Sequence, residues 1–336
     1  MILTIVGGGG LGHVCAAVAS SQGDCEVRLL SGHPQRWCDH ISAVDPDGKI
    51  YNGAIAKISS DAAEVIPGAD IVLLCLPGYL IEQNIQKIAP FLDKGAALGT
   101  IVSSTGFFLF AHRNLSSDVP LFGFQRVPFI SRVKEYGHSA LLLGYKKEVA
   151  LAVENHPDAE WLRAQMERLF VTPAKLLASF YEAALTNSNP ILHTGRLFTM
   201  WHNWDGKPYD HQILFYREWD VPSAQKLIDM DEEFMALLDK LPVRKGVVPS
   251  LLEYYESHDA QSLTDKIRSI VPFQTITAPM KVSGGGWVPD FGSRYFTEDF
   301  PFGLKLIKDL ALENGVASPN IDEVLAWGLS VCDANV

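Results

Sequence analysis

The sequence predicts an α/β fold with an N-terminal doubly wound parallel sheet and a C-terminal, mainly α-helical domain. Three observations lead to this prediction. Apolar strand-like runs alternate with helical stretches through the first half, a Gly-rich turn separates the first strand from the first helix, and helical periodicity replaces strand-like runs after about residue 176. Because 336 residues exceed one typical domain, we place two domains at residues 1–175 and 176–336.

The first element in chain order is a strand that runs into a Gly-rich turn and then a helix. The apolar run at residues 2–6 is followed by Gly7, Gly9, Gly10 and Gly12, and a second strand follows at residues 26–30. Gly7 permits a tight turn, Gly9 lets the backbone approach a pyrophosphate, and Gly12 lets the helix lie close to the strand. The pattern predicts a dinucleotide-binding Rossmann unit in which these four glycines contact the cofactor.

Further elements continue the alternation. Strands are expected at residues 70–76, 97–102, 121–124 and 139–144, with helices at 35–41 and 158–170. The third strand ends at Leu76 and Pro77, which we expect to contact the cofactor. In the second half, helices are expected at residues 225–241 and 304–313.

The cofactor preference depends on the end of the second strand, where NAD-binding units usually carry Asp or Glu. Ser31 stands there, with His33 and Arg36 soon after. Without a carboxylate, a 2′-phosphate is not repelled, and Arg36 or His33 supplies positive charge, so the sequence leans toward NADP(H) over NAD(H). Two alternatives stay open: Arg36 as a solvated residue of the helix expected at 35–41, and Ser31 bonding a 2′-hydroxyl.

Composition limits the expected partners. A net charge of −11 opposes binding to nucleic acid or anionic lipid, and no apolar run approaches the roughly 20 residues of a membrane helix. Five scattered cysteines without a CxxC pair suggest neither a disulfide framework nor a metal site. We expect a cytoplasmic protein whose partners are small molecules or a second copy of itself.

Two segments of the second half contain more polar and charged residues than packing requires. In residues 186–196, Asn189 precedes His193 within an apolar helical context, where a hydrogen-bonded core histidine is the alternative interpretation. In residues 293–304, Arg294 precedes Asp299, which lies just before Pro301. A helix N-cap is the alternative role for Asp299.

Together these segments resemble the octopine/nopaline dehydrogenase family, the opine dehydrogenases. The resemblance covers nearly the whole chain: the glycine turn, residues 26–30 with Arg36-Trp37, and the blocks 122–129, 135–137, 189–193 and 294–304. It implies a Rossmann domain followed by a helical domain, with the substrate between them. It also implies condensation of an α-keto acid such as pyruvate with an amino acid, and reduction of the resulting imine by a nicotinamide hydride to an N-(carboxyalkyl) amino acid.

The resemblance also implies residue roles. His193 matches the family's proton-transferring imidazole, and Asp299 its carboxylate partner. Arg294 matches a carboxylate-binding guanidinium, while Gln125 and Arg126 match a stretch that faces the substrate. The alternative interpretation of Gln125 and Arg126 is a surface turn. Asn189 is expected to orient the substrate or the loop before His193.

Two other functions remain open. A ketopantoate-reductase-like keto-acid reductase also joins a Rossmann domain to a helical one, but it relies on a lysine, and here Lys226 and Lys240 lie on amphipathic faces without a polar motif. An NADPH-sensing protein without catalysis would keep the glycine turn and would not need His193, Asp299 and Arg294 together.

Overall fold

The computed structural model describes residues 1–333. The chain divides into two compact units, and the boundary in the sequence lies between Thr186 and Asn187. Residues 176–186, which the sequence assigns to the second domain, group with the first unit. The reason is helix α6 (Phe180–Ala184), which packs against two strands of the first unit's sheet, β7 and β10. Each unit is described here by itself.

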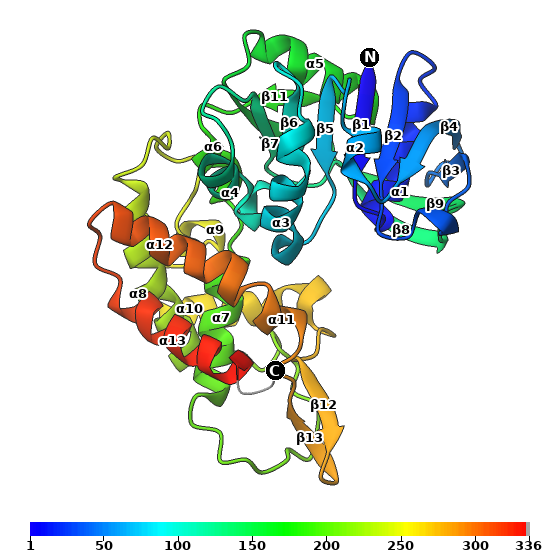
Figure 1. The fold of residues 1–336 in the computed structure, drawn as a ribbon. Helices are drawn as coiled ribbons and strands as arrows, with labels where there is room; N and C mark the ends of the chain where they lie inside the picture. The colour runs from blue at the N-terminus through cyan, green and yellow to red at the C-terminus, as the bar shows by residue number, and fades with distance from the viewer. Residues whose placement is uncertain (334–336) are drawn as a thin grey trace. The chain divides into compact units, whose positions relative to one another are not determined.

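The first unit is built on an eleven-stranded sheet in the order β11-β10-β7-β6-β5-β1-β2-β4-β3-β9-β8. Its centre is parallel, because β1 pairs in parallel with β2 and β5, and β6 continues the same arrangement to β7. The central strands are β1 (Ile2–Val6), β2 (Glu26–Leu30), β5 (Ile71–Leu74), β6 (Ala97–Thr100) and β7 (Leu121–Phe124). The predicted doubly wound parallel sheet is therefore confirmed at its centre (Figure 1).

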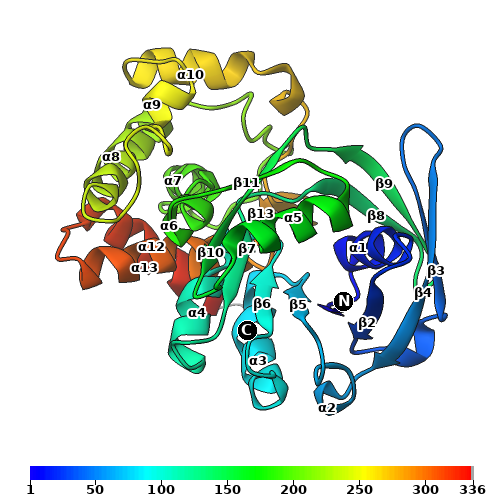
Figure 2. The same cartoon turned by 90° about the horizontal axis from the view of Figure 1, so that it is seen from above.

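Antiparallel pairs extend the sheet on both sides. Strand β10 pairs antiparallel with β7, β4 with β3, and β9 with β8. The outer strands are β3 (His40–Val44), β4 (Ile50–Ser59), β8 (Phe129–Glu135), β9 (Ser139–Tyr145), β10 (Val149–Glu154) and β11 (Ala174–Leu176). Figure 2 shows β4, β3, β9 and β8 curving around helix α1 (Gly10–Ser20), which they contact.

The helix expected at residues 35–41 is wrong. Pro34–Arg36 form a single 3₁₀ turn, and β3 begins at His40. Residues of β3 alternate between buried and more exposed positions and pair with β4, so sheet pairing of a β-branched segment outweighs its weak helical pattern.

The other helices of this unit are α2 (Ala62–Val65), α3 (Gly78–Ile88), α4 (Phe107–Asn114) and α5 (Ala159–Phe170). The Asp158 side chain accepts a hydrogen bond from Trp161 N at the start of α5. The hydrophobic core joins Leu3 and Ile5 of β1 to Phe122, Phe124 and Phe170, all fully buried.

The second unit is mainly helical, as predicted. Its helices are α7 (Asn189–Trp201), α8 (Val221–Leu238), α9 (Leu251–Tyr254), α10 (Ala260–Ser269), α11 (Arg294–Thr297), α12 (Lys305–Glu313) and α13 (Pro319–Asp333). Residues Phe300–Leu304 form a π-helical turn, and β12 (Met280–Ser283) pairs with β13 (Gly286–Pro289) in a hairpin (Figure 1).

Helix α7 is the centre of this unit. Its residues from Pro190 to Phe198 are all buried, and α8, α13 and the π-helical turn pack on it. Polar side chains on α7 therefore need partners from other segments. Among residues 1–333, no helix has the length and apolar content that crossing a membrane requires.

Candidate active site

The Gly-rich turn has the form that a pyrophosphate site requires. Gly7 has a φ of 122°, and a Cβ on Gly12 would lie 2.0 Å from the Gly7 carbonyl oxygen. Helix α1 therefore starts against the end of β1, and no side chain caps its first turn. A Cβ on Gly9, in contrast, would meet no atom within 4 Å. Bare backbone, open space and a helix N-terminus fit the phosphates of a dinucleotide.

Leu76 and Pro77 border this turn. They follow β5, which pairs with β1, so the carboxyl ends of both strands lie side by side. The Leu76 Cδ2 atom is 3.0 Å from the position of a Cβ on Gly7, and Pro77 precedes α3 as its N-cap. The structure thus brings both residues to the glycine turn.

Ser31 and Arg36 lie on the other side of the turn. Ser31 is buried, and its Oγ accepts hydrogen bonds from Trp37 Nε1 at 3.2 Å and His33 N at 3.3 Å. The exposed Arg36 guanidinium lies 4.3 Å from the ring centroid of Tyr136. Arg36 is not part of a long helix, so its position is set by this cation–π contact and the 3₁₀ turn.

A second buried histidine, His13, supports the glycine turn and was not predicted. Its Nδ1 donates to Gly9 O at 2.9 Å, and its Nε2 accepts from Gly137 N at 2.7 Å. Burial lowers the pKa of His13 below its usual value. Its position four residues after Gly9 in the first helix is the only sequence signal for this contact.

In the second unit, His193 and Asp299 are in contact although 106 positions separate them. The two atoms of the pair, His193 Nδ1 and Asp299 Oδ2, are 2.8 Å apart. Tyr216 Oη lies 2.9 Å from His193 Nε2, so both ring nitrogens have partners. His193 is 8% exposed, and the ring of Tyr295 packs 4.6 Å from its own.

Small residues bring Asp299 to α7. The π-helical turn that follows Asp299 approaches the start of α7 so closely that a Cβ on Gly303 would lie 2.8 Å from Pro190 Cγ. The Asp299 side chain makes no capping hydrogen bond at that turn. The alternative N-cap role is therefore wrong for the carboxylate, which is turned to the imidazole instead.

Tyr216 was missed in the sequence. It lies in a turn between α7 and α8, within the aromatic run Phe215-Tyr216 and close to Trp219, where nothing distinguishes it from a core aromatic. Its ring stacks on Phe273 at a centroid distance of 4.3 Å. Only the fold reveals that its hydroxyl meets His193.

Arg294 and Asn189 lie on the same two segments as the pair. Arg294 begins α11 and is exposed, and within residues 1–333 its guanidinium has no hydrogen-bond or ion-pair partner. Asn189 begins α7 and is exposed four residues before His193, which places both on one face of the helix. These groups are available to a ligand.

Gln125 and Arg126 both donate hydrogen bonds to backbone oxygens near the end of the first unit. They follow β7, and both tether the end of the first unit: Gln125 Nε2 donates to Glu182 O at 3.1 Å, and Arg126 Nη2 to Thr186 O at 2.8 Å. Both side chains therefore have protein partners within the first unit, unlike the side chains of a loose surface turn.

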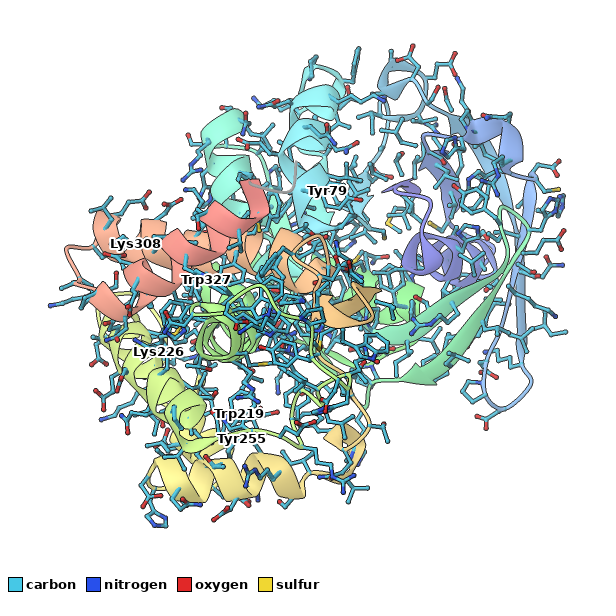
Figure 3. The ribbon with its side chains drawn as sticks, turned by 90° about the horizontal axis from the view of Figure 1, so that it is seen from below. Tyr79, Trp219, Lys226, Tyr255, Lys308 and Trp327 are labelled. Atoms are coloured by element: carbon cyan, nitrogen blue, oxygen red, sulfur yellow. The ribbon has the colours of Figure 1, made fainter. Side chains whose placement is uncertain are left out.

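The lysine that the keto-acid reductase alternative needs is occupied elsewhere. Lys226 Nζ donates to Asn320 Oδ1 and Glu323 Oε2, both at 2.9 Å, and so fastens α13 to α8 (Figure 3). Lys240 is exposed beyond the end of α8. Neither favours that alternative.

A dinucleotide-binding Rossmann unit joined to a helical unit with a histidine–carboxylate pair defines a two-domain NAD(P)-dependent dehydrogenase. Residues 176–332 match the family model described as NAD/NADP octopine/nopaline dehydrogenase, alpha-helical domain. Octopine dehydrogenase of Pecten maximus is 29% identical over 96% of this chain and 88% of its own. Tauropine dehydrogenase of Arabella iricolor is 28% identical over 97% and 90%.

Solved structures agree. Octopine dehydrogenase with NADH and L-arginine superposes with a TM-score of 0.86 at 27% identity, covering 98% of this chain and 89% of that one. These matches confirm the resemblance to the octopine/nopaline dehydrogenases, and the protein is an NAD(P)-dependent oxidoreductase acting on CH–NH bonds.

Proposed function

We propose that this protein condenses an amino acid with an α-keto acid such as pyruvate and reduces the resulting imine to an N-(carboxyalkyl) amino acid, and that it catalyses the reverse oxidation. The observation that carries the proposal is the His193–Asp299 pair, which two remote segments form in the helical unit. Relatives over most of the chain support it, among them octopine and tauropine dehydrogenases and an octopine dehydrogenase structure with NADH and pyruvate.

His193 is the proton-transferring group of this proposal. The Asp299 carboxylate accepts the Nδ1 proton, which fixes the imidazole tautomer and stabilises the cation. Nε2 is then the nitrogen whose proton leaves for the imine nitrogen in reduction and returns in oxidation. The nicotinamide of a dinucleotide whose pyrophosphate is held at the glycine turn would supply the hydride.

Carboxylate binding falls to Arg294 in this proposal. Both substrates carry a carboxylate, and a planar guanidinium holds one through two parallel hydrogen bonds. Arg294 is exposed and without a protein partner within residues 1–333. Asn189 orients the substrate from the same helix face as His193. Gln125 and Arg126 hold the segment that leads into α7 and, in this proposal, also face the substrate.

The finer cofactor proposal is a preference for NADP(H). It is supported by the absence of a carboxylate from residues 30–37 and by Arg36, which lies exposed over Tyr136. Arg36→Gln should raise the KM for NADPH about tenfold and leave that for NADH unchanged. Equal effects on both cofactors would contradict the preference.

The proposed reaction is tested by following nicotinamide absorbance with pyruvate or glyoxylate, a panel of amino acids, and either NADPH or NADH. Oxidation that needs both organic substrates supports imine reduction. Oxidation with the keto acid alone would indicate a keto-acid reductase, and none with any combination would indicate a sensor. A cytoplasmic location and association with a second copy of the chain stay predictions, the latter testable by light scattering.

A further inference from the structure

The hydroxyl of Tyr216 occupies the one ring nitrogen through which His193 can act. Asp299 holds Nδ1, and a carboxylate accepts that proton whether the ring is neutral or charged. Exchange with a substrate must therefore pass through Nε2. Tyr216 Oη lies 2.9 Å from this atom.

The tyrosine ring is held firmly in this position. It is 5% exposed and stacks on Phe273 at 4.3 Å. The preceding residue, Phe215, bonds through its backbone N to Ile276 O at 2.8 Å, and Arg196 Nη2 donates to Glu218 O at 2.6 Å just beyond it. Because Arg196 lies one turn after His193 on α7, the same helix anchors both the histidine and the turn that carries Tyr216. Swinging the ring aside would break these contacts.

The hydroxyl can change its role while the ring stays in place. Burial raises the pKa of Tyr216 well above its usual value, so the hydroxyl keeps its proton at neutral pH. Beside a neutral imidazole it donates to Nε2, and beside an imidazolium it accepts from Nε2–H. Within residues 1–333, His193 is the only protein hydrogen-bond partner of this hydroxyl, so in the second state its own O–H has no protein acceptor and is free to donate to a substrate.

We propose that Tyr216 is a catalytic residue that passes the proton between His193 and the imine nitrogen; this rests on the proposed imine reduction. In reduction, the Tyr216 O–H bond breaks as an N–H bond forms on the imine nitrogen, while the Nε2 proton moves to Oη. Hydride reaches the imine carbon, Tyr216 ends as it began, and His193 changes from cation to neutral base. Oxidation reverses each transfer.

Tyr216→Phe tests the relay, because it keeps the ring and removes only the hydroxyl. We expect kcat to fall about 100-fold or more with the KM for NADPH within about twofold. The pH dependence that is lost in His193→Ala should also be lost in Tyr216→Phe, and the double variant should be no slower than His193→Ala. Tyr255→Phe is the matched control: it removes another buried hydroxyl of this unit, without a contact to His193, and should keep normal turnover.

Two results would overturn the relay. Near-normal kcat in Tyr216→Phe with an intact pH profile would mean that substrate reaches Nε2 directly, and multiplicative losses in the double variant would mean that Tyr216 acts apart from His193. If the variant loses its fold, rates of the unmodified enzyme in H₂O–D₂O mixtures decide: curvature supports two moving protons, and a straight line contradicts the relay. An unmodified protein without amine-dependent turnover would overturn the proposed function, and the relay with it.

Discussion

The two units each bury one histidine with both ring nitrogens bonded, and the partners differ in kind. His13 of the Rossmann unit lies between two backbone groups, the Gly9 carbonyl and the Gly137 N–H. His193 of the helical unit lies between two side chains, the Asp299 carboxylate and the Tyr216 hydroxyl.

The difference teaches which histidine can exchange a proton. A backbone N–H only donates, so a proton added to His13 Nε2 would face the Gly137 N–H, and the ring is locked as a neutral structural link. A carboxylate stabilises an imidazolium, and a hydroxyl accepts as well as donates. His193 is therefore free to alternate between two protonation states. Burial alone does not separate these roles, but the chemistry of the partners does.

The largest expected effect comes from removing the exchanging imidazole. His193→Ala should lower kcat by about 10²- to 10⁴-fold, because it removes general acid–base catalysis, while the Kd for NADPH measured by fluorescence stays within about twofold. His202→Ala, on an exposed residue at the end of the same helix, is the control and should keep full activity. A His193→Ala enzyme with near-normal kcat would show that His193 does not transfer the proton.

Glycine substitutions probe the other unit and should change binding rather than chemistry. Gly9→Ala places a methyl group in open space, so the fold and Tm should be unchanged while the Kd for NADPH rises on the order of 100-fold, since the methyl excludes the pyrophosphate from the backbone. Gly144→Ala, also open, is the control. Gly12→Ala would meet the Gly7 carbonyl and should lower Tm as well. Unchanged affinity in Gly9→Ala would place the phosphates elsewhere.

The Rossmann unit was predictable because its evidence is local. Gly7, Gly9 and Gly12 act within one turn of chain, and the strands around them are short, mostly apolar runs. Prediction failed where pairing outweighs local pattern, as at residues 35–41, where Ile41 joins a sheet that the segment does not specify by itself.

In the helical unit the sequence indicated residues without their contacts. His193 and Asp299 were chosen through family resemblance, and no spacing rule joins positions 106 apart. Nothing in the sequence distinguishes Tyr216 from neighbouring core aromatics, and Asp299 has the sequence pattern of a helix cap. His193 and Asp299 come together because α7 and the π-helical turn pack closely. Gly303 permits this approach, since it has no side chain to collide with Pro190.

A smaller effect is expected at the carboxylate-binding arginine. Arg294→Ala should raise the KM of one carboxylate substrate about tenfold, because a charge-assisted hydrogen-bond pair is lost, and leave the Kd for NADPH unchanged. Arg294→Lys keeps the charge without the two-pronged geometry, so its KM should lie between those of the natural protein and of Arg294→Ala. Steady-state kinetics with each substrate varied checks this, and unchanged KM values for both would remove Arg294 from substrate binding.

The smallest effect separates the two histidines by pH. Because burial lowers the pKa of His13, the unfolded chain binds a proton near pH 6.5 that the folded protein does not, so stability falls as the pH drops below that value. His13→Gln retains a donor and an acceptor without a titrating group. The free energy of unfolding of the natural protein relative to His13→Gln should therefore fall as the pH is lowered through about 6.5, as measured by urea denaturation at several pH values. If this difference in the free energy of unfolding does not change with pH, His13 takes up its proton in the folded state. Its two backbone partners would then not hold the imidazole in its neutral form.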